Sequence, residues 1–129
     1  MSTGDCLAEH LAGTDDVLMH LDEAYAAAQS SIDSGLLVAC EHTICDILGA
    51  TPDQAERPPS SLSNEAIDAC TLFTEKYMLD VANLDDDTVE MVRIHLGDQG
   101  LADFVAGLLV VEQRHRMALA LRAVVGSNP

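Results

Sequence analysis

Apolar residues recur at three- and four-residue steps along most of the chain, which is the spacing of one face of an α-helix. The first stripe accompanies a helix predicted for about residues 15–31 and consists of Val17, Leu21, Ala24, Tyr25, Ala28 and Ile32. Strict alternation of apolar and polar residues in β-branched runs, which is typical of strands, is missing. The pattern therefore predicts an all-helical chain.

Glycines, prolines and capping residues divide this chain into separate helices. Asp33 or Ser34 is expected to cap a second helix, because both side chains can accept hydrogen bonds from free N–H groups of a first turn. That helix runs to Leu48 and stops at Gly49, since glycine readily adopts the left-handed conformation of a helix end. The loop ATPDQAERPPSS follows, and its prolines cannot continue a helix.

The second half of the chain contains three further helices. Ser63 opens the third helix, and a short fourth helix in LDDDTVEMVRIHLG ends at Gly97. A long last helix follows, over about residues 98–125. We expect one domain over residues 1–129, an all-α bundle of about five helices with a long C-terminal helix. Residues 1–14 are expected to form a loose or short-helical segment.

The last helix carries polar residues within its apolar pattern. At about 100° per residue, one line along it contains Leu101, Val105, Leu108, Glu112, His115 and Leu119. Arg116 follows Glu112 by four residues, a spacing that suits an ion pair. Gln113 and Arg114 would then point outward. We predict that Glu112, His115 and Arg116 face the interior, although the opposite side of this helix is apolar too.

The second helix repeats this feature, because Glu41 lies on its apolar stripe. A buried carboxylate needs a partner, so Glu41 and Glu112 require counter-charges such as Arg116 or a protonated His115. One interpretation is a core network that fixes how the helices pack. The other is a pocket with Glu41, Glu112 and His115 as acid/base groups and Arg116 holding a substrate carboxylate. Titratable groups in apolar surroundings are common at working sites, so the second interpretation stays open beside the first.

The excess of acidic side chains limits the kinds of molecule that the protein can bind. The chain has 22 acidic and 6 basic side chains, a net charge of −16. Such a surface repels phosphate backbones and anionic lipids, so we expect no nucleic-acid and no membrane partner. No uninterrupted apolar run approaches the roughly eighteen residues of a membrane span, and MSTGDCLAEH does not resemble a signal peptide. We expect a cytoplasmic location.

The cysteines and histidines give no metal-binding pattern. The four cysteines at positions 6, 40, 45 and 70 form no C-x-x-C pair, and their spacing does not resemble a zinc site. We expect buried, inert thiols. Glu112 and His115 fit the E-x-x-H motif of di-iron bundles, but such centres need two copies and further glutamates. We therefore expect no metal and no cofactor.

Two stretches of the chain resemble a known family. These are LSNEAIDACTLFTEKYMLDVANLDDDTVEMVRIHLGDQGLADFVAGLLVVEQRHRMALAL and the shorter DSGLLVACEHTICDILGA before it. Their order, an acidic-capped short helix followed by a long apolar helix with an arginine and an alanine-leucine tail, resembles the carboxymuconolactone decarboxylase / AhpD-like alkylhydroperoxidase family. The resemblance covers about the last hundred residues. It implies an all-helical bundle that assembles into homo-oligomers, from dimer to hexamer.

The sequence departs from the peroxidase branch of that family, which uses a C-x-x-C pair with a nearby glutamate and histidine. If Gly49 matches the glycine before the family's cysteines, Ala50 and Asp53 take the cysteine positions. If Cys40 is the first cysteine, Thr43 takes the second position. Either alignment loses the thiol pair, so we expect no disulfide-based peroxidase activity.

Two functions remain open. The first, slightly favoured, is a thiol-independent acid/base enzyme of decarboxylase, isomerase or lyase type that acts on a small organic acid. The second is a non-catalytic homo-oligomeric binding or accessory protein. An enzyme should have an enclosed cavity that reaches Glu112, His115 and Arg116, with at least one partner position unfilled. A structural network should have every donor and acceptor paired and no cavity.

Overall fold

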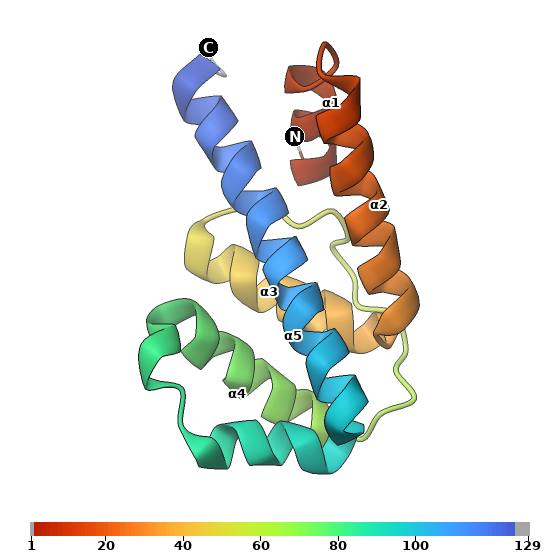
Figure 1. The fold of residues 1–129 in the computed structure, drawn as a ribbon, viewed down its shortest axis with the longest axis vertical. Helices are drawn as coiled ribbons and strands as arrows, with labels where there is room; N and C mark the ends of the chain where they lie inside the picture. The colour runs from red at the N-terminus through yellow and green to blue at the C-terminus, as the bar shows by residue number, and fades with distance from the viewer. Residues whose placement is uncertain (1, 126–129) are drawn as a thin grey trace.

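The computed structural model describes residues 2–125, apart from the side chain of Asp15, and that part of the chain contains helices and loops but no strand (Figure 1). The helices are α1 (Thr3–His10), α2 (Asp15–Ser31), α3 (Ser34–Leu48), α4 (Asn64–Asp80) and α5 (Asp86–Val125), with the short 3₁₀ helix η1 (Val81–Asn83) after α4. The expected all-α bundle with a long C-terminal helix is confirmed.

The long helix α5 organises the molecule. Its second half rises diagonally through the bundle, with α2 along one side and α3 crossing it (Figure 1). α1 lies at the end of the bundle where α5 finishes, while α4 lies at the other end beside the first part of α5. α5 contacts α1, α2, α3 and α4. Side chains from all four can therefore reach it.

The ends of α3 follow from local chemistry. Asp33 is its N-cap and accepts a hydrogen bond from the N–H of Leu36 at 3.0 Å. The same carboxylate accepts hydrogen bonds from Ser60 and Ser61, which fastens the loop before α4 to the start of α3. Gly49 closes the helix in the left-handed conformation, with φ of 74°. These predicted boundaries are confirmed.

Gly97 separates the two parts of α5. Its backbone is non-helical, with φ of 78° and ψ of 175°, a conformation that side-chain-bearing residues rarely adopt. The predicted end of a helix at this glycine is confirmed. The helical conformation continues directly after Gly97, however. The two predicted helices therefore meet at a kink, with no loop between them.

The buried apolar residues form two clusters. The main core contains Ile32, Leu36, Leu37, Cys40, Ile44, Ile67, Cys70, Phe73, Val92, Phe104, Leu108 and Val111. A smaller cluster joins α1 to the end of α5 and contains Cys6, Leu7, Leu11 and Ala118. All four cysteines are buried and free, as the sequence predicted.

The helix α5 is long and apolar enough to span a membrane, by length and composition alone. An 18-residue window of it has a mean hydropathy of 1.3, and 22% of that window is buried. The sequence-based expectation considered only uninterrupted apolar runs and therefore missed this window. Core helices of soluble proteins pass the same test, so the expected absence of a membrane partner and the cytoplasmic location stay predictions.

Candidate functional site

The buried face of α5 is not the face that the sequence predicted. After the kink at Gly97, its buried positions are Phe104, Gly107, Leu108, Val111, Arg114, His115 and Ala118. This face is rotated from the predicted line, because α5 is apolar on two sides and its periodicity fits both. The rotation brings Arg114 inside, where the sequence placed it outside. It turns Arg116 outward, so the predictions for both arginines were wrong.

His115 lies at the centre of a network of buried polar side chains. Its side chain has 0% exposure, so no water-sized space adjoins it. Nδ1 is 2.5 Å from the Thr3 hydroxyl, and Nε2 is 2.7 Å from a carboxylate oxygen of Glu41. Cys45 Sγ lies 3.4 Å from Nε2. With its proton on Nε2, the imidazole donates to Glu41 and accepts from Thr3, so both nitrogens have partners. Glu41 and His115 are buried together, as predicted.

Glu41 has a second partner on α2. The Tyr25 hydroxyl donates to the other oxygen of Glu41 at 3.0 Å. Burial, together with the charge and hydrogen bond of Glu41, raises the pKa of Tyr25 well above its ordinary value of 10.0, against a smaller opposing effect of Arg114. Tyr25 therefore remains a hydrogen-bond donor at neutral pH, and Glu41 has a partner for each oxygen.

Arg114 extends the buried polar network to the loop after α3. Its guanidinium lies 4.0 Å from the centroid of the Tyr25 ring, a cation–π contact. It also donates to Asp53 at 2.8 Å, and the other oxygen of Asp53 accepts from the backbone N–H of Gly4 at 2.8 Å. Burial alone would raise the pKa of Asp53, but these two donors hold it below its ordinary value. Among the described residues, Arg114 Nε is buried without a partner.

Glu112 and Arg116 lie apart from this network. Arg116 Nε donates to Glu112 at 2.8 Å, which confirms the predicted ion pair. The Glu112 side chain is 15% exposed and that of Arg116 is 49% exposed. Neither is enclosed in the interior, which corrects the predicted placement of Arg116 and, in part, that of Glu112.

A cleft of about 500 Å³ lies in front of this pair. Its walls come from the end of α4, from η1 and from α5, and they include Tyr77, Glu112 and Arg116. The Tyr77 hydroxyl donates to the second oxygen of Glu112 at 2.8 Å. Burial, with the hydrogen bond and charge of Glu112, raises the pKa of Tyr77 to about 12.

The four predicted site residues therefore form two pairs, Glu41 with His115 and Glu112 with Arg116. Within the described part of the chain, no hydrogen bond or ion pair joins the two pairs directly. The first pair is sealed from solvent, whereas the second pair borders an open cleft.

Sequence reasoning missed the partners of the two buried or half-buried glutamates. The chain has two tyrosines, and each donates its hydroxyl to one of the two glutamates. Both tyrosines lie on apolar helix stripes, and a tyrosine hydroxyl in such a place needs a partner. That requirement could have predicted the pairing of Tyr25 with Glu41 and of Tyr77 with Glu112. No comparable signal singles out Thr3.

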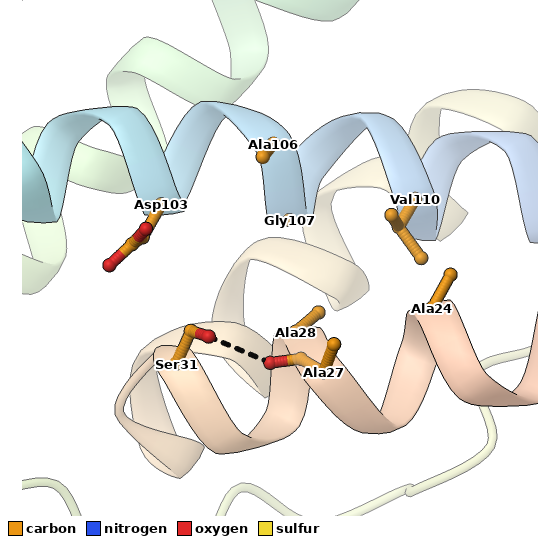
Figure 2. Close-up of a pocket in the computed structure, with 8 residues that line it drawn as sticks. All are labelled: Ala24, Ala27, Ala28, Ser31, Asp103, Ala106, Gly107 and Val110. Carbon is orange, nitrogen blue, oxygen red and sulfur yellow. Dashed lines mark hydrogen bonds between the residues drawn. The ribbon is translucent and has the colours of Figure 1, made fainter.

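A further groove lies between α2 and α5 and has a volume of about 240 Å³. Figure 2 shows its wall of small residues, with Ser31 donating to the backbone carbonyl of Ala27 on its own helix at 2.9 Å. Gly107 allows the close approach here, because a Cβ at this position would lie 2.2 Å from Ile32 Cδ1. Asp103 is the titratable residue of this wall. The groove contains none of the predicted site residues.

No family model, curated protein or solved structure matches this chain. The resemblance to the carboxymuconolactone decarboxylase family therefore remains a prediction.

Proposed function

We propose that the chain is a thiol-independent acid/base enzyme that acts on a small organic acid in the cleft formed by Tyr77, Glu112 and Arg116. One observation carries the proposal: a tyrosine hydroxyl and a guanidinium both donate hydrogen bonds to the carboxylate of Glu112 at the wall of an open cleft. The volume of about 500 Å³ is within the usual range of roughly 300–1,000 Å³ for small-molecule sites.

Each residue has a distinct role in this proposal. Arg116 uses Nε for Glu112, and a guanidinium has two further nitrogens, the number that a bidentate carboxylate contact needs. Glu112 accepts a proton from the substrate and Tyr77 returns one, and the proton held by Glu112 then passes to Tyr77 along their hydrogen bond, which restores both groups. Tyr77 suits the role of acid because its pKa of about 12 keeps the hydroxyl protonated at neutral pH.

Glu41 and His115 are structural in this proposal. The side chains of both residues have 0% exposure, and both ring nitrogens of His115 already have oxygen partners. A general base must reach the proton that it removes, directly or through one water molecule. A side chain with no exposed surface meets that condition only after α1 has moved away.

The test is to follow a panel of small carboxylic acids by NMR in the presence of the purified protein. For an acid that is converted, Glu112→Gln should lower kcat by about 100-fold or more, the usual scale for a lost acid/base group. Arg116→Gln should mainly raise KM, because it removes substrate binding. Arg93→Gln, a surface arginine paired with Glu90 and Asp98, is the matched control. The proposal fails if folded Glu112→Gln protein retains full activity.

A second candidate function is supported by the exposure of the cleft. Arg116 is 49% exposed, so water is not excluded from the groups that would transfer protons, and the site could bind a ligand without converting it. A non-catalytic binding protein would give an Arg116-dependent rise in melting temperature with some acid and no product.

Self-association is proposed with either function. Large apolar side chains are exposed on α5, among them Ile94 at 68% and Leu109 at 49%. Covering such side chains with a second copy would remove them from water. Light scattering coupled to size-exclusion chromatography tests this, and a monomer at all concentrations would contradict it.

A further inference from the structure

We infer that the preferred ligand of this cleft carries an ammonium group as well as a carboxylate, as a free α-amino acid does. The inference rests on the proposed function, since it concerns the same cleft, and it narrows the class of organic acid. It comes from the distribution of charge around the cleft.

The cleft carries more negative than positive charge. Arg116 is its positive group, and Glu112 already neutralises it through their 2.8 Å ion pair. Asp80 adds a second carboxylate to the lining of the cleft. A ligand with a carboxylate alone would bind Arg116 next to Glu112, and the carboxylates of Glu112 and Asp80 would both repel it. Such a ligand would gain little net electrostatic free energy from this cleft.

The wall that contains Asp80 is also the end of α4. The last turn of this helix, from Tyr77 to Asp80, lines the cleft and contains no basic side chain. The helix dipole makes the C-terminal end of a helix partly negative. One oxygen of Asp80 accepts from Asn83 at 2.6 Å. The carboxylate and the helix end thus create a place for a cationic hydrogen-bond donor.

The Glu112–Arg116 pair lies on α5, and the remaining negative charge of the cleft comes from α4. The guanidinium of Arg116 comes from α5, and the negative groups of Asp80 and the helix end come from α4. A zwitterion can satisfy both walls at once, its carboxylate at Arg116 and its ammonium at the end of α4. A simple acid has a group for Arg116 only, and a simple amine has a group for the end of α4 only, so each leaves the other charged group without a contact.

The rest of the wall is apolar. Met78, Leu79, Val81 and Ala82 line the cleft, and Leu79 and Val81 are 71% and 59% exposed. An aliphatic ligand side chain would cover these surfaces and remove them from water. L-Leucine therefore serves as the probe, because it combines the two charges with a branched aliphatic side chain.

The experiment compares three molecules by NMR titration at pH 7 and low salt. L-Leucine has both charged groups, 4-methylpentanoic acid has only the carboxylate and 3-methylbutylamine has only the ammonium. Leucine should bind about tenfold more tightly than either, as expected for one additional charge-assisted contact. Asp80→Asn should bring leucine close to the affinity of the acid, and Arg116→Gln should bring it close to that of the amine. Asp103→Asn, in the groove between α2 and α5, is the matched control.

The outcomes separate this inference from the proposed function. If 4-methylpentanoic acid binds as tightly as leucine and Arg116→Gln weakens it, the inference is overturned and the proposed function stands. If the amine binds as tightly as leucine, the inference is likewise overturned. If none of the three binds while another organic acid is converted, the inference also fails alone. If no organic acid binds or reacts, both fail.

Discussion

Arg114 and Arg116 are two residues apart on α5, yet they lie on opposite sides of it and in different environments. Arg114 is buried, bonded to Asp53 and stacked on Tyr25, whereas Arg116 is half exposed and paired with Glu112 on its own helix. The first guanidinium connects a loop and two helices. The second connects one turn of α5 to the next, at the edge of the cleft.

The two arginines should therefore differ in their effect on stability. Arg114→Met should lower the free energy of unfolding by about 2–3 kcal/mol, because it leaves the half-buried Asp53 without its counter-charge. Arg116→Gln should cost less than about 1 kcal/mol, the usual value of an exposed pair. Urea denaturation measures both, and equal losses would contradict the assignment of Arg114 to the interior.

Glu41 and His115 should act as one unit. Glu41→Gln and His115→Gln should each lower stability by about 2–4 kcal/mol, since each leaves a buried polar partner unsatisfied. The double variant should lose clearly less than the sum of the two, because the residues contact each other directly. A double-mutant cycle in urea measures the coupling, and strictly additive losses would show that the 2.7 Å contact contributes nothing.

Gly107→Ala should destabilise the protein by about 1–3 kcal/mol, the cost of overpacking. The added Cβ would meet Ile32 Cδ1 at 2.2 Å. Adding Ile32→Val removes that methyl group and should restore part of the loss. Gly13→Ala is the control, because its Cβ would have no neighbour within 4 Å. Melting temperatures of the four proteins decide this prediction, which fails if Ile32→Val brings no recovery in the Gly107→Ala background.

Asp33 should contribute to the pH dependence of stability. Burial would raise its pKa, but hydrogen bonds from Ser60, Leu36 and Ser61 hold it below the ordinary value of 3.8. A carboxyl with a lowered pKa stabilises the fold above its ordinary pKa, and this contribution is lost as the pH falls through the lowered value. Asp33→Ala should cost about 1 kcal/mol at pH 7, as a lost N-cap does.

The comparison with Asp33→Asn isolates the titration. Asparagine still caps α3 but does not ionise, so its stability relative to wild type should improve as the pH falls below about 4. Unfolding curves between pH 2.5 and 7 provide the measurement. A constant difference across that range would mean that the charge of Asp33 does not stabilise the fold.

The thiols should react slowly in the folded protein. Cys40, Cys45 and Cys70 are buried, and burial raises the pKa of each to about 12, so the reactive thiolate is scarce at neutral pH. Alkylation monitored by mass spectrometry should label these cysteines in urea and leave them unlabelled without it. Rapid labelling of Cys45 in native protein would show that the region around His115 opens.

The helix boundaries could be predicted because they depend on neighbouring residues. Asp33, Gly49, Ser63 and Gly97 each act within one turn of their own position, and each marks a helix end or a break in the structure. The buried face of α5 could not be predicted in the same way. Its apolar residues surround the helix, so the choice depends on which other helices pack against it.

The candidate site could be predicted only in part, because some of its contacts depend on how distant segments pack. Glu41 lies on a predicted stripe that is buried, and His115 is one of the positions common to the predicted and the observed face of α5. Their contact follows from the packing of α3 on α5. Thr3 and Asp53 come from α1 and from a loop. Hydrophobic periodicity does not describe how such segments dock, because their positions depend on hydrogen bonds that form only in the complete fold.

The contact between Thr3 and His115 spans 112 positions of the chain. During synthesis the ribosome makes the hydroxyl early and the imidazole only after more than a hundred further residues. Until then Thr3 lacks the imidazole that it contacts, and the apolar side chains of α1 lack the end of α5 that covers them. We therefore expect α1 to be among the last of these helices to dock, with the buried histidine as its anchor point.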